Sequence, residues 1–371
     1  MKTIGIQRTS YPEIRNITSL NQDRAVYRVI PSQFPDDPAI AESLNKSGLF
    51  TQYATYPSPS EPIDCYHTFN SIPLNNIPFV CSYEASIPRW WGVDEAMWRR
   101  GVDRLCSDDC RRLFAISNWA LELTRSFLAR FGQDAVNIIM DKTELLYPPQ
   151  SLPASIYPAK FTQPAQLIFT YVGGDFYRKG GYEFICAMEK ILKSGAPVKV
   201  NLVANLTPRN ENYPWNLETD KKAAHARTII GQYPGQINYH QRLDTKDVLQ
   251  LFHDSHVAVL PSYHDTFGFS VLEAQSNYCP VITTNQRAFP EINDDEIGWV
   301  IPLRLDKQGQ TNVNAASFEF VSNQLKENLV HIIQQIIDSP ESLQKKASLA
   351  HERIQTVHCP TLIGDRIYRW Y

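Results

Sequence analysis

The chain has 371 residues, a length that favours two domains of roughly 150–200 residues over a single one. Hydrophobic residues make up 43% of the sequence, which is enough to build two packed cores. The formal net charge of −3 gives no electrostatic basis for general nucleic-acid binding.

The cysteines and the apolar runs indicate the compartment. Seven cysteines are scattered along the chain without a C-x-x-C pair, so we expect reduced thiols in a cytosolic protein. The first residues lead into polar sequence, which predicts no signal peptide. No run approaches the roughly 18 apolar residues that span a bilayer, so no membrane-spanning segment is expected.

The first half alternates short apolar runs with turn residues. Strands are expected over residues 3–7, 78–83 and 113–116, and the second of these ends at Glu84. Ser117 and Asn118 predict an N-cap for a helix over 119–131, followed by a strand over 136–140. His67 is expected to be structural rather than catalytic.

Residues 90–112 are rich in Trp and Arg, beginning with Trp90 and Trp91. The stretch suits an acceptor platform or an interfacial patch that contacts anionic lipid. A solvated helix with internal ion pairs explains the same residues, because five acids dilute the positive charge. The sequence does not decide between the acceptor platform, the lipid-contacting patch and the solvated helix.

A proline-rich linker over 150–164 precedes the second half. A buried strand over 166–172 runs into a glycine-rich segment that contains Arg178 and Lys179, and a helix with core spacing follows over 182–192. Glycines let the backbone approach a ligand, and a helix N-terminus with two cations suits a diphosphate.

Further elements follow in regular alternation. Strands are expected over 198–204 and 237–239, and helices over 220–233, 245–253 (capped by Thr245), 317–337, 341–357 and 361–371. This alternation predicts two doubly wound parallel sheets, with ligands at the carboxyl ends of their strands and the active site in a cleft between the domains.

The most informative stretch runs from residue 257 to 273, V-A-V-L-P-S-Y-H-D-T-F-G-F-S-V-L-E. A short buried strand ends at Pro261, a polar turn contains Asp265, and a helix begins after Gly268 and carries Glu273. The helix start suits an anion, and the two carboxylates can accept hydrogen bonds from hydroxyl groups.

This stretch, with P-V-I-T-T-N at 280–285 and Pro290-Glu291 after it, resembles the donor site of retaining GT-B glycosyltransferases, especially glycosyltransferase family 4. Asp265 stands where that family usually has Glu. The segment V-G-G-D-F-Y-R-K-G-G at 172–181 resembles the family's phosphate loop, with Gly174 in the place of a frequent Arg. The resemblance implies two Rossmann-like domains, an acceptor-side domain (1–155) and a nucleotide-sugar domain (156–356). It also implies a C-terminal helix (357–371) that crosses back to the first domain.

The resemblance also implies roles for individual residues. Lys179 is the main phosphate ligand, Asp265 holds sugar hydroxyls and Glu273 holds the ribose. Arg178 either replaces the missing Arg or faces solvent, and Arg242 either borders the base or is a surface residue. Glu84, where relatives often have His, either orients the acceptor hydroxyl or pairs with Arg89. The implied donor-binding set is Gly174, Arg178, Lys179, Gly180, Arg242, Asp265, Thr266, Phe267, Gly268 and Glu273, and the implied catalytic set is Asp265, Lys179 and Glu84.

The expected activity is retaining, metal-independent transfer of a hexosyl group from a nucleotide-diphospho-sugar to a hydroxyl of a glycan, glycolipid or other acceptor, as in polysaccharide biosynthesis. No cofactor is expected beyond the donor, and the location is cytoplasmic, with peripheral contact at the inner membrane face through residues 90–112. One alternative is a non-catalytic GT-B scaffold that binds nucleotide sugar or glycan. A nicotinamide-dependent oxidoreductase is a third reading, but G-x-G-x-x-G is missing.

Overall fold

The computed structural model describes residues 1–31, 53–57, 62–89, 93–153, 159–162, 164–208 and 213–371. These residues form two compact units, and each is described by itself. Unit 1 contains Met1–Gln150 and Val357–Tyr371, and unit 2 contains Ser151–Thr356. The boundary that we predicted between residues 155 and 156 lies outside the described residues.

Unit 1 is built on a parallel sheet with six strands among its described residues. Their order is β2 (Ala25–Val29), β1 (Lys2–Ile6), β4 (Cys65–Phe69), β6 (Phe79–Tyr83), β7 (Cys110–Ala115) and β8 (Thr143–Leu145). A smaller parallel pair joins β3 (Tyr53–Ala54) to β5 (Ile72–Pro73). The strands expected over 3–7, 78–83 and 113–116 are therefore confirmed.

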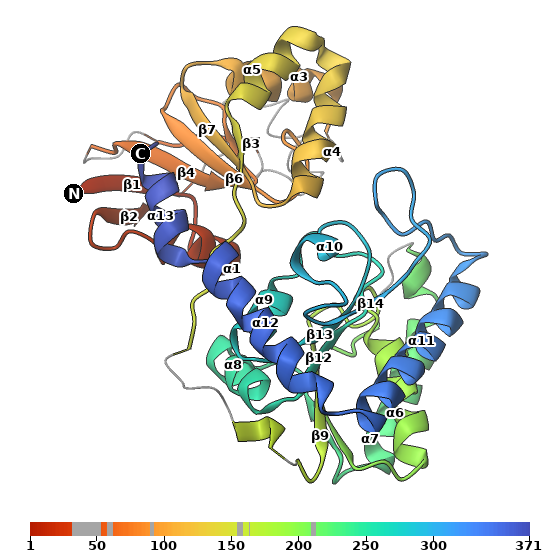
Figure 1. Cartoon of the computed structure of the whole chain (residues 1–371). Helices are drawn as coiled ribbons and strands as arrows, with labels where there is room; N and C mark the ends of the chain where they lie inside the picture. Colours follow the sequence, from red (N-terminus) through yellow and green to blue (C-terminus); the bar gives the residue numbers. More distant parts are fainter. Residues whose placement is uncertain (32–52, 58–61, 90–92, 154–158, 163, 209–212) are drawn as a thin grey trace. The chain divides into compact units, whose positions relative to one another are not determined.

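The helices of unit 1 follow the same alternation with the strands (Figure 1). They are α1 (Tyr11–Glu13), the π-helical turn Ile14–Thr18, α3 (Glu95–Cys106), α4 (Asn118–Leu128), the 3-10 turn Ala129–Phe131, α5 (Gln133–Asp141) and α13 (Pro360–Tyr368). Ser117 caps α4, as predicted, because its side chain accepts a hydrogen bond from the Ala120 N–H at 3.1 Å.

Two local predictions were wrong. Residues 136–140, predicted as a strand, lie in helix α5, where Val136 and Ile139 are buried and Ile138 is exposed, a helical spacing rather than an alternating one. The helix expected to be capped by Thr245 is capped by the residue before it, Asp244, which accepts from the Asp247 N–H at 3.0 Å.

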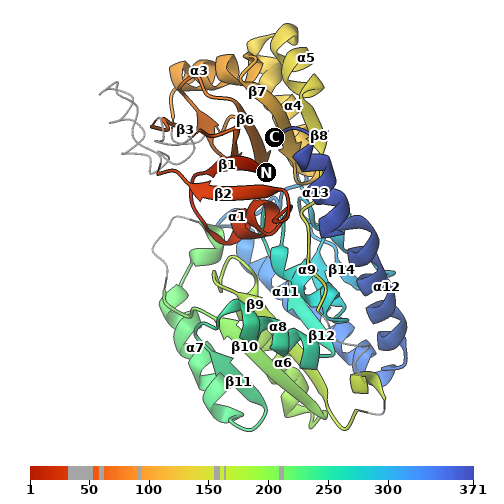
Figure 2. The same ribbon diagram turned by 90° about the vertical axis from the view of Figure 1, so that its left-hand side faces the viewer.

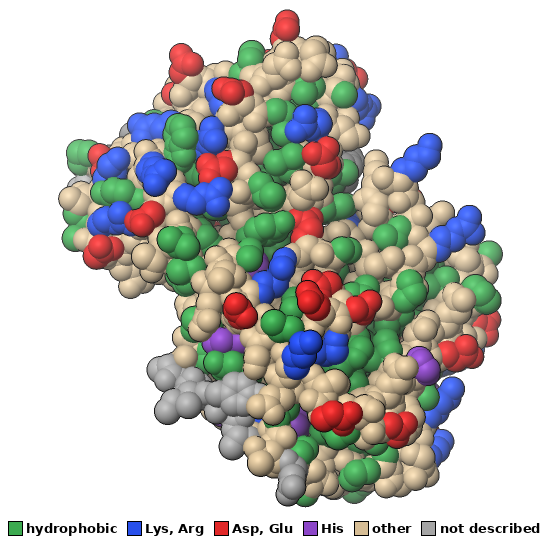
Figure 3. Space-filling view, viewed as in Figure 1, with side chains coloured by type: hydrophobic (Ala, Val, Ile, Leu, Met, Phe, Trp, Pro, Cys, Tyr) green, Lys and Arg blue, Asp and Glu red, His purple; other side chains and the backbone are tan. Residues whose placement is uncertain are grey.

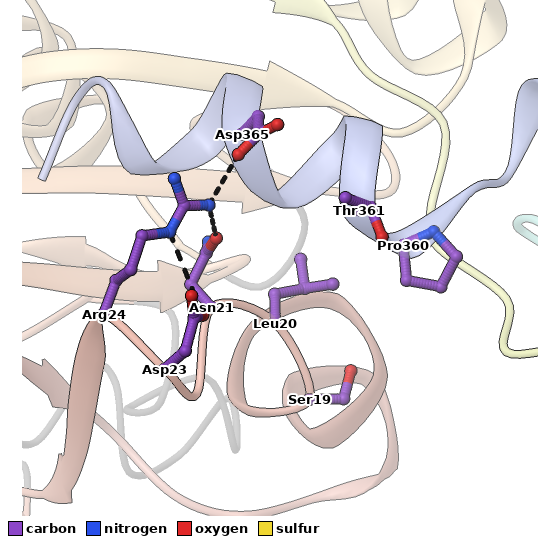
Figure 4. A pocket seen from close by; sticks show the side chains of 8 residues that line it. All are labelled: Ser19, Leu20, Asn21, Asp23, Arg24, Pro360, Thr361 and Asp365. Atoms are coloured by element: carbon purple, nitrogen blue, oxygen red, sulfur yellow. Dashed lines mark hydrogen bonds and ion pairs between the residues drawn. The ribbon is translucent and has the colours of Figure 1, made fainter.

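Helix α13 is held on unit 1 by a cluster of polar contacts around Arg24 (Figure 4). The Arg24 guanidinium lies 2.6 Å from an Asp365 carboxylate oxygen, and the Asn21 side-chain amide donates to the Gly364 carbonyl at 2.8 Å. A hollow of about 350 Å³ lies beside these residues. Because its charged groups pair with one another, the cluster serves to attach α13.

Unit 2 is built on a second parallel sheet with six strands among its described residues. Their order is β11 (Ile237–His240), β10 (Val198–Ala204), β9 (Leu167–Gly173), β12 (Val257–Leu260), β13 (Val281–Thr284) and β14 (Trp299–Ile301). Its helices are the 3-10 turns Ala159–Phe161 and Pro214–Asn216, with α6 (Gly181–Lys193), α7 (Thr219–Gln232), α8 (Thr245–Asp254), α9 (Phe269–Ser276), α10 (Phe289–Ile292), α11 (Phe318–Asp338) and α12 (Ser342–Val357).

Helices cover both faces of this sheet, with α6, α7 and α11 gathered on one side and α8 and α9 on the other (Figures 1 and 2). The apolar positions predicted for α6, including Phe184, Met188 and Ile191, are all buried. Each such side chain stabilises the fold by roughly 1.5–3 kcal/mol when fully buried. The packing fixes where α6 begins, and therefore where its N-terminus points.

No helix among the described residues is both long enough and apolar enough to cross a bilayer.

Candidate functional site: a donor site at the switch point of unit 2

The candidate site lies where the strand order of unit 2 reverses. The chain enters the sheet at β9, adds β10 and β11 on one side, and then returns to place β12, β13 and β14 on the other. Strands β9 and β12 are therefore neighbours, and the loops that follow them lead to helices on opposite faces of the sheet (Figures 1 and 2). Parallel sheets of this kind bind ligands at such a point. The two loops are residues 174–180 and 261–268.

Gly180 brings the two loops into direct contact. Its φ is +70°, and a Cβ atom there would lie 2.2 Å from the carbonyl oxygen of Pro261 in the second loop. The Tyr263 N–H donates to the Arg178 carbonyl oxygen at 3.1 Å, so the backbones are also hydrogen-bonded. Only glycine fits at position 180 without displacing the loops.

The Lys179 ammonium and the Asp265 carboxylate meet where the loops join. Their closest atoms, Nζ and Oδ2, are 2.9 Å apart, and the side chains remain 20% and 12% exposed. Burial is the largest influence on the pKa of Asp265 and raises it, but the charges of Lys179 and Arg178, with hydrogen bonds from Lys179 and the Thr266 backbone, together outweigh burial and lower the pKa. The pair therefore presents one positive and one negative group side by side.

Arg178 does not face open solvent. Its Nε atom lies 3.0 Å from an Asp175 carboxylate oxygen, and another guanidinium nitrogen donates to the His264 carbonyl oxygen. Arg178 thus connects the first loop to the second and does not have the solvent-facing position that was one alternative. Its other role, replacing the missing Arg as a phosphate ligand, stays a prediction.

The two helices that follow these loops begin without a side-chain cap. The N-cap residues are Gly180 for α6 and Gly268 for α9, and neither carries a side chain that can accept from the first N–H groups. Gly268 has a φ of +90°, and a Cβ atom there would lie 2.5 Å from the Phe289 ring. Both helix starts therefore offer N–H donors and a positive dipole end to an anion.

The other predicted donor-binding residues of this region differ in their burial. Glu273 lies within α9 and is 5% exposed, and Phe267 is buried beside Phe269 with ring centroids 5.2 Å apart. Thr266 is half-buried. Gly174 borders open space, because a Cβ atom there would have no neighbouring atom within 4 Å.

His264 and Arg287 belong to the same neighbourhood, and the sequence analysis missed them. An Arg287 guanidinium nitrogen contacts His264 Nε2 and lies 2.5 Å from the Gln310 side-chain oxygen. Burial and the two nearby arginines lower the pKa of His264 to about 3. Because Arg can only donate, the neutral imidazole accepts at Nε2 and carries its proton on Nδ1. The position of His264 next to Asp265 was the available signal.

Two predicted site residues belong to elements other than these two loops. Arg242 is exposed after β11, an outer strand separated from β9 by β10. Glu84 follows β6 in unit 1, where it lies 2.9 Å from Arg89 and accepts from the Asn70 amide at 3.2 Å. The ion pair with Arg89 is the alternative that the sequence left open for Glu84.

The Trp- and Arg-rich stretch is largely engaged within unit 1. Trp90 and Trp91 lie outside the described residues. Trp98 packs against Phe127, and Arg104 pairs with Asp109 at 2.9 Å. On the face seen in Figure 3, basic and acidic side chains are interspersed rather than gathered into a broad basic field. Within the described ranges, no group of three or more His, Cys, Asp and Glu side chains is placed to hold a metal ion.

The fold and the loop geometry together define the GT-B class, as predicted from the sequence. Residues 157–316 match the family described as glycosyl transferases group 1. The predicted resemblance to GT-B glycosyltransferases is confirmed, and the prediction of a glycosyltransferase is supported, whereas family 4 stays a prediction.

Individual relatives agree with this assignment. Glycogen synthase of Mycobacterium tuberculosis is 26% identical over 195 residues, which cover 52% of this chain and 39% of that protein. The match thus spans about two fifths of the length of the curated relatives. Among solved structures, HepE from Anabaena in complex with UDP is similar with a TM-score of 0.63 and 12% identity, over 100% of this chain and 99% of that one. WaaG, a glycosyltransferase involved in lipopolysaccharide biosynthesis, is similar with a TM-score of 0.59 and 14% identity, over 98% and 99%.

Proposed function

We propose that the protein is a retaining, metal-independent glycosyltransferase that moves a hexosyl group from a nucleotide-diphospho-sugar to a hydroxyl group of a glycan, glycolipid or other acceptor. The observation that carries the proposal is the Lys179–Asp265 pair, with its 2.9 Å contact at the junction of the two loops. A donor molecule has a diphosphate next to a sugar. Lys179 supplies a cation for the diphosphate, and Asp265, beside it, supplies a hydrogen-bond acceptor for the sugar hydroxyls.

The positive groups at the junction suit the leaving group. When the bond between sugar and phosphate breaks, negative charge develops on the nucleoside diphosphate. Lys179 and the uncapped starts of α6 and α9 are arranged to stabilise that charge. The proposal that no metal is required rests on these groups, which supply the positive charge that a metal would otherwise provide.

The carboxylates suit the hydroxyl groups of the donor. Asp265 is held ionised by its cationic neighbours, so it can accept from sugar hydroxyls beside the phosphates. Glu273, buried in α9, is assigned to the ribose hydroxyls. The similarity to HepE, which is solved in complex with UDP and with UDP-glucose, makes UDP the first base to test.

Retention of the anomeric configuration follows from the family-4 resemblance, with attack on the donor face from which the phosphate departs. The leaving phosphate oxygen then accepts the proton of the acceptor hydroxyl. Arg242 and Glu84 are assigned to the base and the acceptor by the same resemblance. Their roles, the membrane contact and the place in polysaccharide biosynthesis stay predictions.

The first test is donor binding. UDP-, GDP-, ADP- and TDP-sugars are added to the wild type, Glu273→Ala and the exposed control Glu352→Ala, each in EDTA, and the melting temperature is measured. We expect one nucleotide to raise it in the wild type and the control, and to bind at least tenfold more weakly to Glu273→Ala. A tenfold loss corresponds to about 1.4 kcal/mol.

The second test is turnover. Proton NMR of the product distinguishes a retained from an inverted anomeric centre. An inverted product, or activity that EDTA abolishes, would contradict the proposed mechanism. Binding of a nucleotide sugar without turnover on any acceptor would instead favour the non-catalytic scaffold.

A further inference from the structure

A cavity in unit 2 shares no lining residue with the donor loops. It has a volume of about 500 Å³ and lies between α6, α7 and α11, which Figure 1 shows side by side. The side chains that give it its chemistry are Tyr182 of α6, Lys222 and His225 of α7, and Phe318, Ser322 and Lys326 of α11. The volume is within the range of small-molecule sites, roughly 300–1,000 Å³.

Two lysines converge in this cavity. The Lys222 and Lys326 ammonium groups lie 5.8 Å and 5.3 Å from the centre of the same Tyr182 ring, and Lys222 also lies 4.5 Å from the centre of the Phe318 ring. Both side chains are half-buried. Burial lowers the pKa of Lys222, Glu183 opposes that shift, and the like charge of Lys326 adds to it. Both cations thus border the same cavity and the same ring, and the charge of Lys326 acts on Lys222.

Among the residues that the structure describes, the two ammonium groups are not paired with a carboxylate. Within the described part of the chain, neither lysine forms an ion pair, and their hydrogen-bond partners are the Trp215 carbonyl at 3.1 Å and the Asn323 side-chain oxygen at 3.3 Å. Glu183 is buried and receives the Ser322 hydroxyl at 2.7 Å, so it balances one ammonium charge.

The acids that line the cavity leave Lys222 and Lys326 without an ion-pair partner among the described residues. Glu218 is paired with Lys221, and Glu319 is exposed at the rim, where water screens its charge. Several ammonium N–H groups therefore remain available to a bound anion.

We propose that this cavity is a second anion site that binds a phosphate monoester. Two convergent ammonium groups, which are compact and rotate freely, suit the several oxygens of a tetrahedral phosphate, whereas a planar carboxylate is matched by an arginine fork. The cavity exceeds the size of a phosphate ion, so the organic part of the ligand lies against Tyr182 and Phe318. His225, whose Nδ1 lies 3.0 Å from the Tyr182 hydroxyl, fixes the ring that both lysines face.

The test separates this site from the donor site. Calorimetric titration with inorganic phosphate and with phenyl phosphate is performed on Lys179→Met, which removes the main cation of the donor loops. We expect one remaining site that binds phenyl phosphate more tightly than inorganic phosphate. Adding Lys222→Met and Lys326→Met should weaken that binding at least tenfold, whereas adding Lys193→Met, an exposed lysine of α6 paired with Glu189, should leave it unchanged.

A second measurement needs no variant. Wild-type protein is acetylated under limiting conditions with and without phenyl phosphate, and mass spectrometry follows each lysine. Protection of Lys222 and Lys326, with Lys193 unaffected, supports the site. The inference is overturned if neither lysine is protected, or if the triple variant with Lys222→Met and Lys326→Met binds like the double variant with Lys193→Met. Neither outcome bears on the donor site, because Lys179→Met disables that site in the titration and the acetylation is read at Lys222 and Lys326, which lie outside the donor loops.

Discussion

Two helices of unit 1 and two of unit 2, each following an inner strand of its sheet, begin differently. In unit 1, α3 begins at Asp94, whose side chain accepts from the Met97 N–H at 2.9 Å, and α4 begins at Ser117, which accepts from the Ala120 N–H. In unit 2, α6 and α9 begin at Gly180 and Gly268, which have no side chain to offer. Side chains thus cap these two helices of unit 1, whereas α6 and α9 of unit 2 have no side-chain cap, as an anion site requires.

Within unit 2 a similar contrast holds, because α8 is capped by Asp244 and follows β11, at the edge of the sheet. The two glycine starts lie instead at the switch point, next to Lys179 and Asp265. The missing side-chain caps are expected to lower stability and to favour anion binding. The comparison can therefore be tested by measuring activity and by measuring unfolding free energy.

The largest effect is expected at Lys179. The Lys179→Met variant keeps the aliphatic stem but removes the cation facing Asp265, so we expect kcat/KM to fall by roughly 10²–10³. Steady-state kinetics with the donor found in the binding panel measure this, and Lys193→Met is the matched control. A loss below tenfold would mean that the helix starts suffice without the lysine.

The next effect is on stability and concerns Gly180. A Gly180→Ala substitution forces a non-glycine residue to a φ of +70° and drives its Cβ into the Pro261 carbonyl. We expect unit 2 to lose about 3 kcal/mol of unfolding free energy in denaturant titrations. Gly174→Ala, with open space around its Cβ, should change stability by less than about 0.5 kcal/mol. Equal losses at the two positions would refute the close approach of the loops.

The third effect is a pH dependence in unit 1. His67 is buried between the Tyr371 hydroxyl at 2.6 Å and the Ser82 hydroxyl at 2.9 Å, and burial lowers its pKa to about 3. Below its ordinary pKa of about 6.5 the unfolded chain takes up a proton that the folded unit refuses, so stability falls with decreasing pH.

Between pH 7 and pH 5 this contribution amounts to about 2 kcal/mol. Denaturant titrations of the wild type and His67→Gln at both pH values measure it, and the variant should lose less stability on acidification. The pKa of His264 in unit 2 is lowered in the same way in the wild type and in His67→Gln, so its contribution to the pH dependence cancels when the two are compared. An identical pH dependence would show that His67 titrates normally in the folded state.

The smallest effect is the loss of a cap. Removing the Ser117 hydroxyl by Ser117→Ala leaves the Ala120 N–H without its acceptor, and we expect a loss of about 1 kcal/mol. Asp244→Ala, which removes a cap in unit 2, should cost a similar amount. Thermal unfolding compares the two. A much smaller loss would show that water replaces the cap at little cost.

The sequence was most informative where one local pattern decides the structure. The spacing of Phe184, Met188 and Ile191 predicted α6, and the glycines beside Lys179 predicted the loop before it, because both signals lie within one segment. Residues 136–140 were misassigned because a short apolar run fits a strand and a helix equally well. The contact between His264 and Arg287 was not foreseeable, because it depends on where two loops 23 residues apart meet.

Helix α13 has a consequence for the order in which the chain folds. The Arg24–Asp365 and His67–Tyr371 contacts join the beginning of unit 1 to residues that lie beyond unit 2 in the chain. On the ribosome, the first 150 residues emerge well before residues 357–371, so unit 1 cannot be complete until unit 2 has been synthesised. During that interval His67 lacks the Tyr371 hydroxyl, and the nascent unit exposes the surface that α13 later covers.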